Sequence, residues 1–204
     1  MRLKDFLLKA TSLLFHPLIM PIIGVVFYFL KSPRFFPTPL IKSKLVALTI
    51  LVFVVPVLLY FLLKLTGQVA SINLNTAKER IKPLLFNCLI IILILKHILP
   101  QTEIIELYFF FVGILISNLS CLVLALFKFK ASIHMIGVGG VFMFFIGLSI
   151  HFSVNINGTL ALISIITGAV ATSRLHLKAH TTIELIIGCF IGLFPQLIML
   201  NYWL

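Results

Sequence analysis

Seven almost wholly apolar stretches alternate with short polar segments along the chain. Most of them approach the roughly 20 residues that a helix needs to cross the hydrocarbon of a bilayer. Helices also satisfy their own backbone hydrogen bonds in lipid. The pattern therefore predicts an all-α fold, a polytopic bundle of about seven transmembrane helices, or six if one stretch is re-entrant. The stretches are residues 12–30, 45–63, 84–99, 104–127, 135–152, 156–172 and 182–204.

The composition agrees with this pattern, because 61% of the 204 residues are hydrophobic and only 10% are charged. A water-soluble domain of this length cannot bury so much apolar surface in one core. Basic residues precede the first stretch, as in a signal peptide, but that stretch is long and contains His16, Pro17 and Pro21. We therefore expect one integral membrane domain over residues 1–204, with the first stretch kept as an anchor.

The net charge of +11 is spread over the loops and forms no basic helical stripe with interleaved aromatic side chains. We therefore expect no nucleic acid partner, whereas the lipid bilayer and phosphorylated lipid headgroups are favoured. Cys88, Cys121 and Cys189 lie in apolar stretches without the spacing of a metal or redox motif. The cysteines are expected to be packing residues.

Polar residues gather in three clusters, at residues 75–83, 127–140 and 171–184. Seven crossings place all three clusters on the same side of the membrane, although they are far apart in the sequence. Ionisable groups inside a membrane span are costly and usually mark function. The expected convergence of the clusters is the first indication of a site.

The last cluster combines Arg174, His176, His180 and Glu184. On one helix, the four-residue spacing of the two histidines and the glutamate would place them on one face. A carboxylate there can hold one ring nitrogen and leave the other free to react, while a guanidinium can grip phosphate at two points. Two alternatives stay open: the basic groups can lie at the interface only, or this face can bind zinc or iron.

This cluster resembles the third signature of the type 2 phosphatidic acid phosphatase (PAP2) superfamily, which reads SR, five residues, H, three residues, D. Ser173, Arg174 and His180 match it, and Glu184 stands in place of the aspartate. Signatures similar to those of the family fall within residues 75–190.

The middle cluster contains Ser132 and His134 where a helix is expected to begin, followed by Gly137, Gly139 and Gly140. These glycines favour close packing between helices, since neither their spacing nor their context fits a dinucleotide-binding loop. Residues 131–134 are similar to the second signature of the superfamily, PSGH, with alanine and isoleucine in place of proline and glycine.

The first cluster is basic. Lys78 and Lys82 are expected on one helix face, Arg80 on another, and Pro83 in the first turn of the next helix. A juxtamembrane patch that attracts lipid headgroups would explain these charges equally well. The first signature of the superfamily is K, six residues, RP; here Lys82 and Pro83 replace RP, and Asn75 replaces the lysine.

The resemblance implies a two-step hydrolysis of a lipid phosphomonoester or pyrophosphate, without a metal or another cofactor. His180 would attack phosphorus and form a phosphohistidine, Glu184 would orient its ring, and His134 would protonate the leaving oxygen. The groups expected to bind the phosphate oxygens are Arg174, Lys82, either Lys78 or Arg80, and Ser132.

The substrates implied are phosphorylated membrane lipids such as a phosphatidate, a phosphatidylglycerophosphate, a prenyl pyrophosphate or a lipid-sugar phosphate. Two rival functions fit the same residues. One is a metal-dependent membrane enzyme that uses His176, His180 and Glu184. The other is a membrane protein that binds lipid phosphate without turnover, which the altered PSGH segment favours, because Ile133 limits how closely phosphate can approach.

Two arguments disagree on the side of the membrane that holds the site. The site face carries eleven Lys and Arg residues and the opposite face five, so the positive-inside rule places the site in the cytoplasm. Without the five that belong to the site and its turn, the count is six against five and decides nothing. The resemblance favours the periplasmic-type face of a bacterial inner membrane, and we adopt that expectation.

Overall fold

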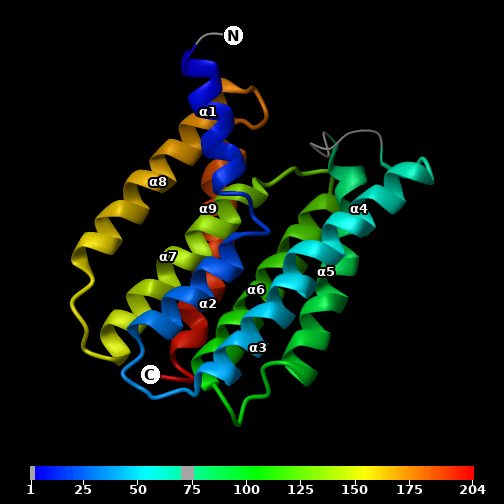
Figure 1. The fold of residues 1–204 in the computed structure, drawn as a ribbon. Helices are drawn as coiled ribbons and strands as arrows, with labels where there is room; N and C mark the ends of the chain where they lie inside the picture. Colours follow the sequence, from blue (N-terminus) through cyan, green and yellow to red (C-terminus); the bar gives the residue numbers. More distant parts are fainter. Residues whose placement is uncertain (1–2, 70–75) are drawn as a thin grey trace.

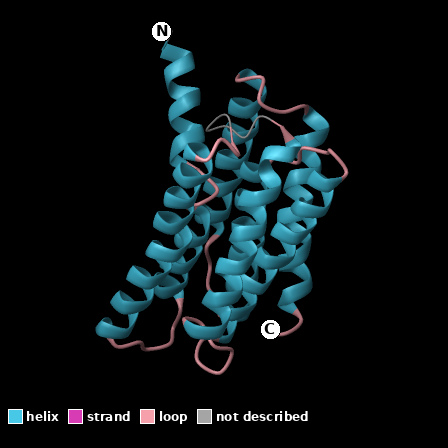
Figure 2. Ribbon diagram, turned by 90° about the vertical axis from the view of Figure 1, so that its right-hand side faces the viewer, coloured by secondary structure: helices cyan, strands magenta, loops and turns pink. Residues whose placement is uncertain are grey.

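The computed structural model describes residues 3–69 and 76–204, and every regular element in these ranges is helical. The helices are long and run along a common direction, with α1 at one end of the bundle and the C-terminus at the other (Figures 1 and 2). The predicted all-α bundle is confirmed. The elements are α1 (Leu3–Leu14), α2 (Met20–Lys31), α3 (Thr38–Thr49), the π-helical η1 (Ile50–Val54), α4 (Val55–Leu65), α5 (Ala77–His97), α6 (Ile105–Leu126), α7 (Ile133–His151), α8 (Asn157–His176) and α9 (Thr182–Leu200).

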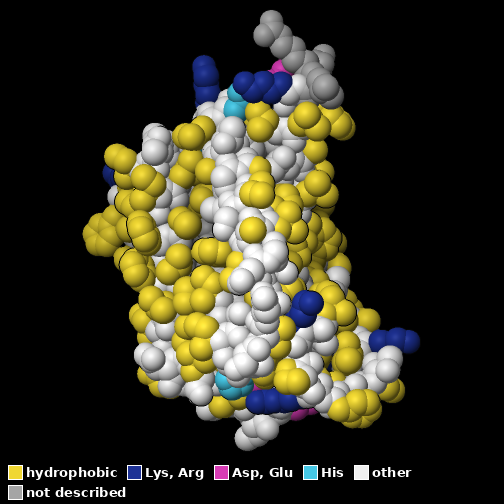
Figure 3. Space-filling model, turned by 90° about the vertical axis from the view of Figure 1, so that its left-hand side faces the viewer, with side chains coloured by type: hydrophobic (Ala, Val, Ile, Leu, Met, Phe, Trp, Pro, Cys, Tyr) yellow, Lys and Arg dark blue, Asp and Glu magenta, His cyan; other side chains and the backbone are white. Residues whose placement is uncertain are grey.

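Five helices are long and apolar enough to cross a membrane: α6, α7, α8, α9 and the continuous rod of α3, η1 and α4, which spans Thr38–Leu65. The chain is therefore an integral membrane protein. Figure 3 shows hydrophobic side chains over the middle of the bundle, with most Lys and Arg side chains near its two ends. The other two predicted spans correspond to α2 and α5, which are not among these five helices. Helix α2 has only 12 residues, and α5, with 21 residues, begins with several charged side chains.

The prediction of one continuous helix over residues 12–30 is wrong, because α1 and α2 are separate helices. Pro17 explains the break, since it has no backbone N–H and disfavours a helical conformation for His16 before it. Pro21 is tolerated because it lies in the first turn of α2, where a backbone N–H has no helical partner. Residues 16–19 leave the helical path and line an internal cavity.

Helix α5 begins well before residue 84, where the apolar pattern predicts its start. Thr76 and Glu79 form a capping box, in which each side chain accepts a hydrogen bond from the backbone N–H of the other. Pro83, expected in the first turn, therefore lies inside the helix. The earlier start places Arg80 within α5, where its side chain is buried in the bundle.

Helices α7 and α9 approach each other closely at glycines. A Cβ atom at Gly139 would lie 2.7 Å from the Cys189 carbonyl oxygen, and one at Gly188 would lie 2.7 Å from the Ser132 carbonyl oxygen. Larger side chains would separate the helices, so the predicted packing role of the glycines in the middle cluster is confirmed. The contact holds the start of α9 against the start of α7, where the Ser132 N–H donates to the Glu184 carbonyl at 3.0 Å.

At the opposite end of the bundle, a fully buried carboxylate joins several elements. Glu106 of α6 lies 2.7 Å from the Arg34 guanidinium and 3.2 Å from Nε2 of His151 on α7. The hydroxyl of Tyr28 on α2 donates a further hydrogen bond to Glu106 at 3.1 Å. Because a buried charge without partners is costly, these contacts fix α2, α6 and α7 relative to one another.

Candidate active site

The three polar clusters meet at the end of the bundle where α1 lies (Figure 1), so the predicted convergence is confirmed. One side chain joins the start of α5 to the α6–α7 and α8–α9 turns. Arg80 donates to the Ala131 carbonyl at 2.6 Å and to Nε2 of His180 at 3.4 Å. Arg80 and His180 line a cavity of about 1070 Å³ that extends into the bundle.

His180 lies buried in the turn before α9, and both of its ring nitrogens have partners. Nδ1–H donates to Oε2 of Glu184 at 2.8 Å, and Nε2 lies 3.4 Å from Nη2 of Arg80. Because a guanidinium can only donate, this arrangement leaves Nε2 as the unprotonated nitrogen. An imidazole held in this way presents a lone pair at the cationic end of the cavity, as a nucleophile requires.

Glu184 also caps helix α9, a role that is not predicted from the sequence. Its Oε2 accepts a hydrogen bond from the Thr181 N–H at 3.0 Å, and the Thr181 hydroxyl accepts one from the Glu184 N–H at 3.3 Å. The T-x-x-E pattern is the sequence signal for such a capping box. Capping alone explains why a glutamate stands here, and the contact with His180 is what connects it to the site.

Arg174, in the last turn of α8, is buried and lines the cavity. Its Nη1 donates to the Ser12 hydroxyl of α1 at 2.9 Å, whereas its buried Nε has no hydrogen-bond partner in the described part of the chain. Leaving a buried guanidinium nitrogen unpaired is costly. This end of the cavity therefore offers a free donor to an anion, next to the place that Ser12 occupies.

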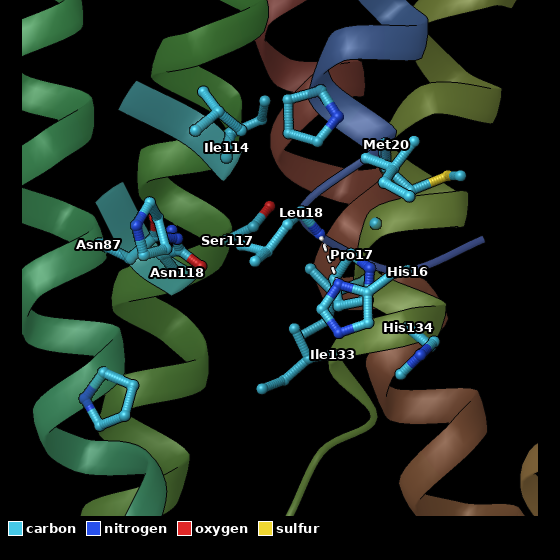
Figure 4. A pocket seen from close by; sticks show the side chains of 18 of the residues that line it. His16, Pro17, Leu18, Met20, Asn87, Ile114, Ser117, Asn118, Ile133 and His134 are labelled. Atoms are coloured by element: carbon cyan, nitrogen blue, oxygen red, sulfur yellow. Dashed lines mark hydrogen bonds between the residues drawn. The ribbon is translucent and has the colours of Figure 1, made fainter. Parts of the chain in front are cut away.

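His134, in the first turn of α7, contacts the same serine. Its Nε2–H donates to the Ser12 carbonyl at 3.1 Å and lies 3.3 Å from the Ser12 hydroxyl oxygen. The His16 ring stands edge-on to the His134 ring, with 5.5 Å between the centroids; Figure 4 shows both rings. Ser12 and His16 were missed as site residues, because they lie in the first apolar stretch and only the break at Pro17 signals their position.

Ser132 is the N-cap of α7 and is completely buried. Its hydroxyl has no partner among residues 3–69 and 76–204, and its N–H is taken by the Glu184 carbonyl. Ser132 does not line the cavity, so it stands behind the candidate site and not in it. The starts of α7 and α9 both lie here, where helix N-termini favour an anion.

The structure separates Arg80 from the two lysines of the first cluster. Lys82 is exposed and donates to Oε1 of Gln68 at 2.6 Å, and Lys78 is also exposed. Neither lysine lines the cavity, whereas Arg80 does. The sequence pattern predicts only that Arg80 lies on another helix face than the two lysines. Asn75, in the lysine position of the first signature, lies outside the described residues.

The single helix face expected for His176, His180 and Glu184 is not formed. Helix α8 ends at His176, and the turn to α9 passes through Lys178 in the left-handed conformation, with φ of 51°. His176 instead donates from Nε2 to Asp5 of α1 at 2.8 Å. Across the described ranges, no group of three or more His, Cys, Asp or Glu side chains is placed to hold a metal ion.

One end of the cavity is strongly cationic, and the Glu184 carboxylate beside it is engaged with His180. Burial, and after it the charges of Arg80 and Lys130, lower the pKa of His180 against the opposing hydrogen bond to Glu184. The ring is therefore neutral near pH 7, and the surrounding field attracts an anion. The cations that line this end are Lys9, Arg80, Lys130, Arg174 and Lys178.

Away from the cations, the cavity is mainly apolar. Side chains of α2, η1, α4, α5, α6 and α7 line it, together with the segment before α2; Figure 4 shows Leu18 of that segment, Met20 and Ile114. A cationic end joined to a long apolar interior matches an amphiphile with an anionic head. The shape of the space therefore agrees with the lipid partner that the composition favours.

No protein-family model matches the chain, and no curated protein and no solved structure matches it. The similarity to the PAP2 signatures therefore stays a prediction. The chemistry of the site has to be argued from its residues.

Proposed function

We propose that this chain is a membrane phosphatase that hydrolyses a lipid phosphomonoester or pyrophosphate through a phosphohistidine intermediate. The observation that carries the proposal is the pairing of Nδ1 of His180 with Glu184 while Nε2 faces Arg80 at the cationic end of the cavity. These contacts bring together a nucleophile, an orienting carboxylate and a cation. The apolar interior suits the hydrocarbon of a lipid substrate.

In the first step, Nε2 of His180 attacks phosphorus in line with the lipid oxygen. The N–P bond forms while the P–O bond to the lipid breaks, and His134, whose charged form the bound phosphate anion favours, gives its proton to the departing oxygen. Arg80 and Arg174 bind the non-bridging oxygens and offset their charge in the transition state. Glu184 stabilises the positive charge that develops on the attacking ring.

In the second step, water attacks the phosphohistidine. His134, now neutral, takes a proton from the water, and the N–P bond breaks as the new P–O bond forms. Inorganic phosphate leaves, Nε2 of His180 regains its lone pair, and His134 is protonated again. The products are inorganic phosphate and the lipid alcohol, or the lipid monophosphate where the substrate is a pyrophosphate, and the side chains are restored for another cycle.

Within this proposal the chain crosses the membrane seven times, through α2, the rod of α3 to α4, and each of α5 to α9. We assign the site to the outer, periplasmic side of a bacterial inner membrane, following the resemblance. The Thr76→Cys variant tests this assignment, because Thr76 is exposed at the start of α5. A membrane-impermeant reagent should label it in cells with a permeabilised outer membrane; labelling only after lysis would put the site inside.

Phosphate release from a panel of lipid phosphates tests the function. The purified chain should release phosphate from at least one of them, and His180→Ala should lower the rate by at least about 10³-fold. His97→Ala is the matched control, because His97 is exposed at the far end of α5 and its loss should leave release unchanged.

Two outcomes would favour the rival functions. Binding of vanadate or lipid phosphate without release from any lipid on the panel would indicate a binding protein. Loss of activity with a chelator, restored by added metal, would indicate the metal-dependent enzyme.

A further inference from the structure

Polar side chains also lie deep in the cavity, among its apolar walls (Figure 4): Asn87 of α5, and Ser117 and Asn118 of α6. Asn87 follows Arg80 by about two helical turns, or about 10 Å along the helix axis. These polar groups therefore lie beyond the proposed phosphate position, in the part of the cavity that would hold the lipid portion of a substrate.

The two neighbours on α6 differ in how their polar atoms are satisfied. The Ser117 hydroxyl lies 2.9 Å from the Gly113 carbonyl oxygen and 2.9 Å from the Ile191 carbonyl oxygen, so it ties helices together. Asn118 is only 7% exposed, and its Nδ2 has no hydrogen-bond partner within the described residues. An unpaired amide is costly in the interior of a membrane protein, and it requires an explanation such as a ligand.

The missing partner of Asn118 is a hydrogen-bond acceptor, since the unpaired group is an N–H donor. Beyond its phosphate, a prenyl lipid is hydrocarbon and offers no acceptor. A glycerolipid carries ester carbonyl oxygens a few bonds from its phosphate, within the distance along α5 that separates Asn87 from Arg80. The depth and the chemistry of the unpaired group therefore point to the same class of lipid.

We infer that Nδ2 of Asn118 donates a hydrogen bond to an ester carbonyl of the substrate, with Asn87 lining the same subsite from α5. The cavity thereby selects acyl-ester lipid phosphates over prenyl phosphates. The inference rests on the proposed function for the position of the phosphate. Arg80 and Arg174 cannot distinguish the two classes of lipid, because both classes present the same phosphate to them. The Asn118 amide can distinguish them, because only the acyl-ester lipids carry a carbonyl acceptor.

The test compares three ligands that share a phosphate: a diacyl phosphatidate, its dialkyl ether analogue, which has no carbonyl groups, and farnesyl monophosphate. Binding is measured with the His180→Ala protein in detergent, so that turnover does not interfere. The diacyl lipid should bind about three- to tenfold more tightly than the ether analogue, as expected for one neutral hydrogen bond. With Asn118→Leu added, this preference should disappear while farnesyl monophosphate binds as before or more tightly.

Ile114→Val is the matched control, because Ile114 lines the same cavity without an amide and should change all three affinities alike. Equal binding of the diacyl and ether lipids by the His180→Ala protein would overturn the inference without any Asn118 variant. An equal loss for all three ligands in Asn118→Leu would do the same. A carbonyl preference without hydrolysis of any ligand by the wild-type chain would end the proposed function and leave this subsite standing.

Discussion

Oε2 of Glu184 lies 2.8 Å from Nδ1 of His180, and the same oxygen accepts the backbone N–H of Thr181 at 3.0 Å. One carboxylate therefore orients the candidate nucleophile and closes the first turn of α9. The helix cap and the proposed chemistry use the same oxygen, and suitable variants can separate the two roles.

Glu184→Gln keeps an oxygen for the Thr181 N–H but removes the negative charge. We expect kcat to fall by at least about 10²-fold with little change in melting temperature, because a neutral amide stabilises a charged imidazole poorly. Glu184→Ala should also lower the free energy of unfolding by about 1 kcal/mol, since the capping box is lost. Phosphate release and thermal unfolding in detergent measure the two effects.

The capping box of α5 provides the control for this prediction. Glu79→Ala removes the corresponding glutamate there and should reproduce the stability loss without the loss of kcat. If Glu79→Ala lowered kcat as much as Glu184→Ala does, Glu184 would be no more than a helix cap.

The dependence of turnover on pH should also change in Glu184→Gln. His180 is expected to attack as the neutral ring, so turnover falls as the pH drops through its pKa. Burial lowers that pKa, and the hydrogen bond to Glu184 raises it. Because Glu184→Gln removes the raising effect, the acid limb of the kcat/KM profile should move to lower pH. An acid limb that moves to higher pH would mean that another group controls it.

His134→Ala should separate the proton donor from the nucleophile. A lipid alkoxide leaves poorly without a proton, whereas p-nitrophenolate leaves readily as an anion. Because general acid catalysis contributes about 10²–10⁴-fold, the loss for a lipid phosphate should exceed that for p-nitrophenyl phosphate by at least about tenfold. The comparison holds where formation of the phosphoenzyme limits the rate.

His180→Ala is the reference for that comparison, since it should depress both substrates alike. Equal losses on both substrates in His134→Ala would assign His134 to phosphate binding, or to the support of α1 through Ser12.

Arg80→Lys keeps a positive charge but cannot reach Ala131 and His180 with one planar fork, so kcat/KM should fall by about 10- to 100-fold. Lys82→Ala should leave kcat/KM nearly unchanged, because the Lys82 ammonium binds Gln68 outside the cavity. Steady-state phosphate release measures both variants. A larger loss in Lys82→Ala than in Arg80→Lys would indicate that Lys82 binds the phosphate and Arg80 does not.

At the far end of the bundle, Glu106→Gln should lower the free energy of unfolding by about 2–3 kcal/mol, because Arg34 and His151 lose a buried charged partner. Glu103→Gln, which weakens the ion pair of a more exposed carboxylate with Lys44, should cost less than about 1 kcal/mol. Denaturant unfolding in detergent compares the two. Similar losses would contradict the importance that we give to burial.

The hydrophobic pattern predicts the positions of α6 to α9 well, because each is an uninterrupted apolar run between turn-forming segments. It also predicts that the three polar clusters meet, since the two crossings between each cluster and the next return the chain to the same face. Within the last cluster, His180 and Glu184 meet as their spacing suggests.

Where the observed site differs from the predicted one, the cause is a helix that begins or ends at another residue than the sequence pattern predicts. An apolar pattern does not detect the capping box at Thr76, so it starts α5 too late and turns Arg80 the wrong way. The spacing of His176 and His180 has meaning only on an unbroken helix, and the left-handed Lys178 interrupts it.

Contacts that depend on tertiary packing leave no local signal at all. The hydrogen bond from Arg174 to Ser12 joins residues that are 162 positions apart, and it forms because α1 packs beside α8. The unpaired amide of Asn118 is equally invisible in the sequence, since an asparagine in an apolar run does not reveal whether a partner is present.

Arg80 binds Ala131 in the turn before α7 and His180 in the turn before α9, so one side chain joins segments that emerge from the ribosome at different times. Synthesis runs from the N-terminus, and α9 is the last of these helices to be made. In the proposed mechanism, a nascent chain holds its phosphate-binding arginines before it has the nucleophile in place. Such a chain cannot hydrolyse the lipids around it until the final helix inserts. In the proposed mechanism, only fully assembled molecules therefore contribute to the measured activity.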